Sequence, residues 1–140
     1  RATRFNNENG GATMSPDVAV TTPNDFINLL GMLMNKGSIE EKQVMSEKAI
    51  QEMETLQFTS LPVKYVHKEA TGYRTGLGCW ISSDGKEITS LNMTGFYPFI
   101  DRCRNYAGLL LPGKTLGEPN RALYAQFKEN LNASFGDACK

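Results

Sequence analysis

Residues 72–111 read GYRTGLGCWISSDGKEITSLNMTGFYPFIDRCRNYAGLLL, and their pattern is that of strands separated by turns. Aromatic and apolar residues alternate with glycines at 73–82, and a second run follows at 86–92. Between the two runs stands Asp84-Gly85, a dipeptide that favours a two-residue hairpin turn. We therefore expect the two runs to form an antiparallel pair.

Two further strands are predicted downstream, at 96–101 and 106–111, with a turn around Arg104-Asn105 between them. The whole stretch 72–111 then holds about four strands in succession. Strands joined by such short turns form an antiparallel sheet.

Helical spacing of apolar residues marks the chain before this sheet, and we predict a helical part at 22–57. Its first helix has Thr22 as N-cap, Pro23 at the first helical position and Asp25 in the first turn, with Gly37 as its stop. Four apolar residues of this helix fall at helical spacing: Phe26, Leu29, Leu30 and Leu33.

A second helix is predicted to begin at Ser46 and to place Ala49, Ile50, Met53 and Leu56 on one face. The charged residues before it, Glu40, Glu41 and Lys42, are interpreted as a solvated connector. Residues 1–20 are expected to be irregular, because asparagine and glycine are frequent there.

The last predicted helix spans 118–135, where Leu123, Phe127 and Leu131 recur every four residues. The order is then two helices, strands and one helix, which predicts an α+β fold with an antiparallel sheet flanked by helices. A chain of 140 residues with 40% hydrophobic side chains can bury the core of a single domain.

The charge balance narrows the classes of partner. The chain carries 15 basic and 15 acidic side chains, so its formal net charge is zero. A chain without net charge is not attracted as a whole to nucleic acid or to an anionic membrane surface, so its composition does not favour either as a partner. No apolar run approaches the roughly 20 residues that cross a bilayer, so we expect no membrane span.

The three cysteines, Cys79, Cys103 and Cys139, are too few and too widely spaced for a paired zinc motif. Cys79 and Cys103 fall in neighbouring predicted strands and could form a disulfide. Two buried free thiols are the alternative.

A complete catalytic set is not found within these residues. A Ser-His-Asp triad needs a histidine base, and the single histidine, His67, falls in a polar connector. Ser83 and Lys86 have the Ser-x-x-Lys spacing of a nucleophile and its base, but that chemistry needs both residues on one helical turn. Because Asp84-Gly85 favours a hairpin here, we interpret the motif as coincidence.

The order of the segments resembles that of the serine β-lactamase-like hydrolases, which include class C β-lactamases, D-alanyl-D-alanine carboxypeptidases and related esterases. The resemblance extends from about Gly10 to Ser134 and rests on several motifs taken in order. They are Val20–Phe26 with Leu29–Gly37, Val44-Met45-Ser46, Gly76-Leu77-Gly78-Cys79-Trp80, Met93–Asp101, Tyr106–Leu111 and the final helix.

The resemblance implies that residues 1–140 are the C-terminal portion of a larger domain with a partial β-lactamase/transpeptidase-like fold. The serine nucleophile would lie upstream, in the remaining N-terminal portion of the same protein or in a second chain. The whole protein would act on an amide, lactam or ester bond of a small-molecule or peptide substrate through an acyl-enzyme. No metal or organic cofactor is implied, and the family's usual location is the bacterial envelope, periplasmic or secreted.

The resemblance also assigns site residues. Thr94 would bind a substrate carboxylate, Gly95 would let the substrate approach the backbone, and the Phe96 N–H would be one oxyanion donor. Met93 stands where the family has lysine or histidine, and a thioether supplies neither the charge nor the donor. A non-catalytic binding or interaction protein, with the same or another α+β fold, is therefore the alternative.

Overall fold

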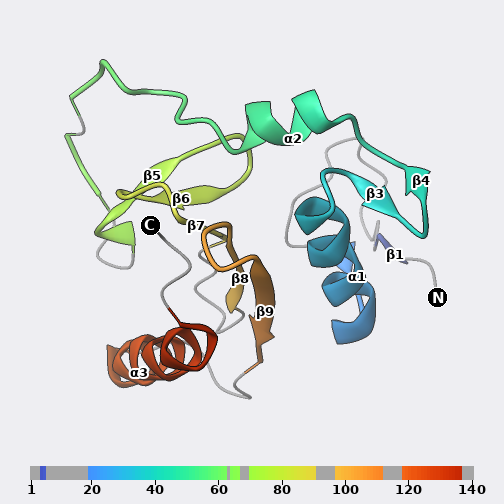
Figure 1. Cartoon of the computed structure of the whole chain (residues 1–140). Coiled ribbons are helices and arrows are strands. Elements are labelled where there is room, and N and C mark those ends of the chain that lie inside the picture. The colour runs from blue at the N-terminus through green and yellow to red at the C-terminus, as the bar shows by residue number, and fades with distance from the viewer. Residues whose placement is uncertain are drawn as a thin grey trace.

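The computed structural model describes residues 4–5, 19–62, 64–66, 70–90, 97–111 and 118–136. Figure 1 shows an α+β architecture in which helices α1 and α3 lie on either side of one antiparallel sheet. This is the predicted fold class. Within the described ranges, no helix is long and apolar enough to cross a membrane.

The main sheet has five strands in the order in which they follow along the chain. They are β5 (Tyr73–Thr75), β6 (Trp80–Ser82), β7 (Glu87–Thr89), β8 (Tyr97–Asp101) and β9 (Tyr106–Leu110). Every neighbouring pair is antiparallel. The longest pairing joins β8 to β9, with Phe99 opposite Gly108 and Ile100 opposite Ala107.

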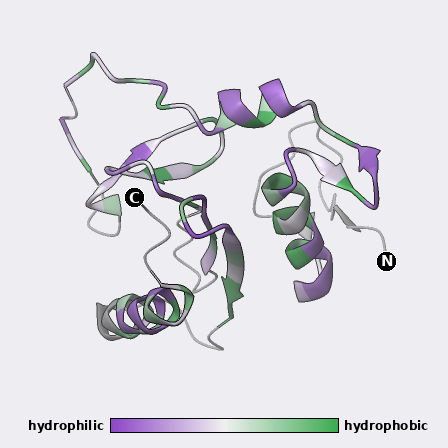
Figure 2. Cartoon of the chain, viewed as in Figure 1, coloured by the Kyte–Doolittle hydropathy of each residue, from purple (hydrophilic) through white to green (hydrophobic). Residues whose placement is uncertain are grey.

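Helix α1 (Pro23–Met34) covers one face of this sheet. Leu30 of the helix forms the core of that layer with Ile88 of β7 and Ile100 of β8, all of them buried. Six partly buried side chains surround this core: Phe26, Leu33, Met34, Cys79, Ala107 and Leu109. In Figure 2 the later turns of α1 are hydrophobic and its first turn, which contains Asp25, is hydrophilic.

Helix α3 (Glu118–Phe135) covers the opposite face through aromatic contacts. The ring of Tyr97 stacks on that of Tyr124 with centroids 5.5 Å apart, and Tyr106 stacks on Phe135 at 4.6 Å. The Tyr106 hydroxyl also donates a hydrogen bond to Asn132 Oδ1 at 2.8 Å. Because β-strand side chains alternate between faces, residues of odd number in β8 meet α3 and residues of even number meet α1.

The predicted apolar face of α3, Leu123, Phe127 and Leu131 broadened by Ala122, Tyr124 and Phe135, is buried only in part. Leu123 and Phe127, expected to lie in the core, are 61% and 41% exposed, whereas Tyr124 is 9% exposed. The sheet offers aromatic rings to this helix. Tyr124 is buried where it stacks on Tyr97, whereas Phe135 stacks on Tyr106 and stays 53% exposed.

The predicted cap of α1 is present, and Ser46, where the second helix was predicted to begin, is the N-cap of α2. Thr22 Oγ1 accepts a hydrogen bond from the Asp25 N–H at 3.1 Å, and Ser46 Oγ accepts one from the Ala49 N–H at 3.1 Å. Gly37 follows α1 with φ +89° and donates its N–H to the Met32 carbonyl at 2.8 Å. Lys36, directly before it, also has a positive φ, +54°, and donates its N–H to the Leu33 carbonyl at 3.3 Å. Two residues of positive φ therefore close the helix, and glycine provides the second.

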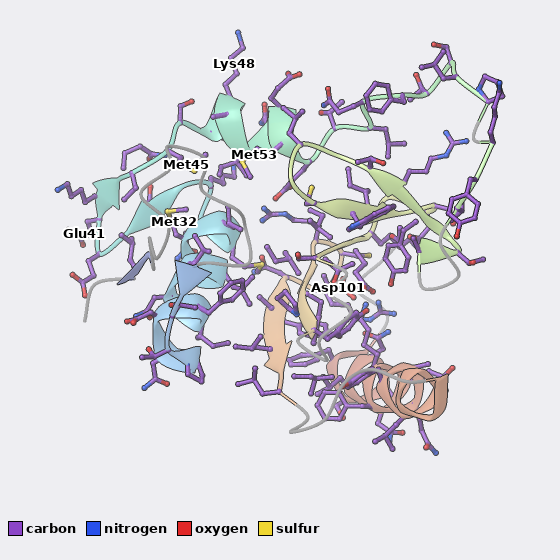
Figure 3. All side chains as sticks on the ribbon, turned by 180° about the vertical axis from the view of Figure 1, so that it is seen from behind. Met32, Glu41, Met45, Lys48, Met53 and Asp101 are labelled. Carbon is purple, nitrogen blue, oxygen red and sulfur yellow. The ribbon has the colours of Figure 1, made fainter. Side chains whose placement is uncertain are left out.

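The prediction of a helical part at 22–57 is wrong in its middle and at its end. Strands β3 (Ser38–Ile39) and β4 (Lys42–Gln43) form a hairpin there, and α2 covers only Glu47–Met53. The two residues of the hairpin turn, Glu40 and Glu41, have φ of +47° and +63°. Two central residues with positive φ are typical of a type I′ turn. Asparagine and glycine usually occupy such a turn, so the two glutamates did not indicate a hairpin in the sequence. Figure 3 shows Glu41 at the tip of this hairpin.

Two other predicted elements need correction. Residues 73–82 form two short strands, because the chain turns back between β5 and β6, where the Gly76 N–H donates to the Cys79 carbonyl at 2.9 Å. Within 1–20, β1 (Arg4–Phe5) pairs with β2 (Ala19–Val20) in a segment that we expected to be irregular.

The cysteines follow neither of the two alternatives. Cys79 is a free thiol, and Cys103 takes part in a disulfide that does not involve Cys79. The Cys79 thiol donates a hydrogen bond to the Met53 carbonyl at 3.2 Å, at the end of α2.

Arg102, just after β8, joins three elements on the α1 side of the sheet. Its guanidinium makes a two-pronged ion pair with the Glu54 carboxylate at the end of α2, in which Nε lies 3.0 Å from Oε2. The same group donates to the carbonyls of Leu33, at 2.9 Å, and Met34, at 3.3 Å. These carbonyls end α1 and have no partner within the helix, so Arg102 caps α1 while it holds α2 in place.

Candidate functional site

The residues that sequence analysis assigns to the active site lie outside the described residues: Met93, Thr94, Gly95 and Phe96. The strands on either side of them are described. β7 ends at Thr89 and β8 begins at Tyr97, and the two are hydrogen-bonded neighbours, with Thr89 opposite Phe99. The roles given to the four residues therefore stay predictions, as does the surface position expected for His67, which also lies outside the described residues.

A buried hydrogen bond ties β7 to β8 near the ends from which that segment departs. Thr89 is 4% exposed, and its Oγ1 donates to the Pro98 carbonyl at 2.6 Å. Proline has no N–H to offer to a strand ladder, and the side-chain bond to its carbonyl adds one link between the two strands. The two strands are thus held together at the base of the predicted site segment.

A buried carboxylate lies at the other end of β7. Glu87 is 8% exposed and accepts hydrogen bonds at Oε1 from the hydroxyls of Tyr73, at 2.9 Å, and Tyr97, at 2.6 Å. Its Oε2 forms an ion pair with the Nζ of Lys128 on α3. The partners come from β5, β8 and α3, so one side chain connects three elements around it.

Lys128 is the cation of this cluster. Its Nζ lies 5.3 Å from the centroid of the Phe99 ring, within range of a cation–π contact. Burial lowers the pKa of Lys128 to about 8, and the Asp84 carboxylate acts in the opposite direction. A pKa of about 8 leaves the ammonium mostly protonated at neutral pH, so the pair with Glu87 is charged there.

The chemistry open to this cluster is limited. Two hydroxyl donors and an ammonium occupy both oxygens of Glu87, so the carboxylate is stabilised as an anion rather than left open as a base. We therefore interpret the cluster as the polar link between α3 and the sheet. Sequence analysis missed it, although one signal was available: Lys128 lies one helical turn after Tyr124, on the same face of the helix.

The Ser-x-x-Lys match lies in the loop between β6 and β7, not on a helix. Ser82 Oγ donates to Asp84 Oδ1 at 2.5 Å, and this bond lowers the pKa of Asp84. The Lys86 N–H donates to the same oxygen at 3.2 Å, and Gly85 has φ +72°. The loop holds four residues rather than the predicted two, yet it excludes the one-turn spacing that a Ser-Lys pair needs.

Nothing in the described part of the chain gathers three or more histidine, cysteine or acidic side chains into a group that could hold a metal ion. No organic cofactor is implied by the motifs either.

A solved structure is similar to this arrangement. It comes from Bacteroides dorei DSM 17855 and is described as a "putative beta-lactamase". The two proteins share 25% sequence identity with a TM-score of 0.64, over 83% of this chain and 38% of the other. No protein-family model and no curated protein matches the chain.

The sheet, its two covering helices and this similarity together define a β-lactamase-like α+β fold. The chain spans 38% of the length of the Bacteroides dorei protein, so it corresponds to a part of that structure.

Proposed function

We propose that residues 1–140 are the C-terminal portion of a β-lactamase-like serine hydrolase. The complete protein acylates an upstream serine with an amide, lactam or ester carbonyl, and water then releases the acyl group. The observation that carries the proposal is the similarity to the Bacteroides dorei protein, which extends over most of this chain but over 38% of that one. A nucleophile in the uncovered part explains why these residues hold no catalytic set.

In this proposal, the segment between β7 and β8 supplies part of the active site. Thr94 binds a substrate carboxylate, Gly95 admits the substrate to the backbone, and the Phe96 N–H stabilises the oxyanion. The hydrogen bonds that hold β7 and β8 together support this role, because oxyanion donors act best when the strands that carry them are rigid.

The partner in the proposal is the rest of the same protein or a second chain. β9 is the outermost strand of the sheet, and among the described residues no strand pairs with its outer side. Leu111, directly after it, is 52% exposed. Unpaired strand edges bordered by apolar side chains favour addition of another strand.

We further propose a location in the bacterial envelope, periplasmic or secreted. The disulfide at Cys103 supports it, since disulfides persist in oxidising compartments.

A non-catalytic binding protein with the same fold is the second candidate, and Met93 is the observation that favours it. A methionine at the position where the family has lysine or histidine removes a cation from the strand that would hold the substrate carboxylate.

Chemical labelling separates the two candidates. We expect a fluorophosphonate probe or a penicillin to add covalently to the complete protein, at a serine upstream of residue 1. Intact mass spectrometry measures the addition, and the chain of residues 1–140, which lacks the nucleophile, is the unlabelled control. A complete protein that neither probe acylates would contradict the hydrolase and favour the binding protein.

A substitution tests the role of position 93. We expect Met93→Lys in the complete enzyme to raise kcat/KM about tenfold for carboxylate-bearing substrates, since a charge-assisted hydrogen bond is restored. Neutral ester substrates serve as the control, and their kcat/KM should not change. Equal effects on both substrate classes would remove Met93 from carboxylate recognition.

A further inference from the structure

A pocket of about 280 Å³ lies beside β5, at the opposite edge of the sheet from β9. Its walls come from β5, from β6 and from the chain that follows α2. Four aromatic side chains line it: Phe58, Tyr65, Tyr73 and Trp80. An apolar cavity of roughly 150 Å³ holds one benzene molecule, so this pocket has room for an aromatic ring with a short substituent.

Two of these aromatic side chains are unusually open to solvent. Phe58 is 61% exposed and Tyr65 is 80% exposed, although both belong to the pocket wall. Exposed aromatic rings gathered at a concave site are typical of ligand pockets, because a bound apolar group covers them.

A positively charged residue also lines this pocket. Arg74 of β5 lines the pocket, and its side chain makes no ion pair or hydrogen bond with any described residue. The other arginines of the sheet region are engaged, Arg102 with Glu54 and Arg104 with Asp101. Within the described ranges nothing engages the planar donors of Arg74, and a carboxylate matches them in charge and geometry.

We propose that this pocket binds a small aromatic monocarboxylate, with the ring between Phe58 and Trp80 and the carboxylate on the Arg74 guanidinium. The site lies on β5 and β6, so it is separate from the segment that follows β7 and does not depend on the proposed hydrolase. The apolar walls supply most of the affinity, and Arg74 selects the charged head group.

Isothermal titration calorimetry on the protein that carries this chain tests the proposal with two probes of equal size. We expect phenylacetate to bind about tenfold more tightly than neutral phenylacetamide, because only the former forms the two-pronged ion pair. Arg74→Gln should remove this preference, and Phe58→Ala should weaken both probes alike. Phe58 is largely exposed, so its truncation leaves the fold intact.

Lys48→Gln is the matched control. It removes one positive charge from α2, where Figure 3 shows Lys48 extending away from the rest of the chain, and it should change neither affinity. Equal binding of the two probes, an unchanged preference in Arg74→Gln, or no saturable binding would each overturn the proposal. Binding to residues 1–140 that disappears when the upstream portion is present would show that another segment fills the pocket, and would overturn it as well.

Discussion

At the scale of single residues, Gly108 shows how closely the sheet is packed. It lies opposite Phe99, and a Cβ added at position 108 would stand 2.5 Å from Cζ and 2.8 Å from Cε1 of that ring. Phe99 is 1% exposed and has little space to move. We expect Gly108→Ala to lower the free energy of unfolding by about 1–3 kcal/mol, as measured by urea denaturation.

Gly31→Ala is the control for this substitution. Gly31 lies within α1, and a Cβ there would meet nothing within 4 Å. Alanine is the better helix former, so the free energy of unfolding should stay unchanged or rise by up to about 1 kcal/mol. Equal losses in the two variants would show that the Phe99 contact is not the cause.

The Cys79 thiol should be slow to react. Burial raises its pKa above 9.0, and the nearby Glu54 carboxylate raises it further. We expect iodoacetamide to modify folded Cys79 far more slowly at pH 8–9 than the urea-unfolded chain, because the thiolate is the reacting form. A similar rate in both states would contradict the raised pKa.

The same shift has a consequence for stability. A raised thiol pKa means that the folded state holds the proton more tightly, so this contribution is complete below pH 9 and is lost as the pH rises through the folded-state value. Between pH 8 and 11, the free energy of unfolding should fall more steeply for the natural chain than for Cys79→Ala. If the free energy of unfolding fell equally with pH in both proteins, ionisation of Cys79 would not contribute to the pH dependence of stability.

At the scale of elements, the attachment of α3 depends on the Glu87–Lys128 pair. Both side chains are nearly buried, at 11% and 13% exposed, and breaking such a pair leaves a charge without its partner. In a double-mutant cycle with Glu87→Gln and Lys128→Met, we expect a coupling energy of about 1–3 kcal/mol. The cycle is measured by urea unfolding.

The exposed pair Lys36–Glu47 provides the comparison. Its atoms are 2.8 Å apart, but the side chains are 69% and 49% exposed. Solvent screens such a pair, so its coupling should be no more than about 0.5 kcal/mol. If the two cycles gave equal couplings, burial would not be what makes the α3 contact strong.

Elements with local chemical signals could be predicted from sequence, and elements without them could not. The caps at Thr22 and Ser46 and the strands around Asn105 follow from residue type. The β3–β4 hairpin was missed because glutamates occupy its turn. The buried face of α3 was predicted only in part, because the sheet decides which side chains of the helix are covered. The link between Glu87 and Lys128 joins residues far apart in sequence. Helical spacing places Lys128 on the same face as Tyr124, but it does not identify Glu87 as the partner. The predicted site at Met93–Phe96 rests on family resemblance alone.

At the scale of the whole molecule, the sheet has two edges of different character. At β5, the Thr75 carbonyl accepts a hydrogen bond from the Gln57 N–H at 3.2 Å, so this edge is partly covered by the chain itself. At β9, half of the backbone groups point away from β8, and the described residues place no strand beside them. If the protein has the upstream portion that we propose, we expect that portion to add at this edge.

Hydrogen exchange of the β9 amides tests that arrangement. In residues 1–140 alone, we expect alternate amides of Tyr106–Leu110 to exchange rapidly, because no described strand pairs with those on the outer side. In the complete protein the same amides should be protected at least about tenfold, since a strand hydrogen bond must open before exchange occurs. The amides of β7, which has neighbours on both sides, are the internal reference and should be slow in both forms. Unchanged exchange at β9 would contradict the addition of a strand at this edge.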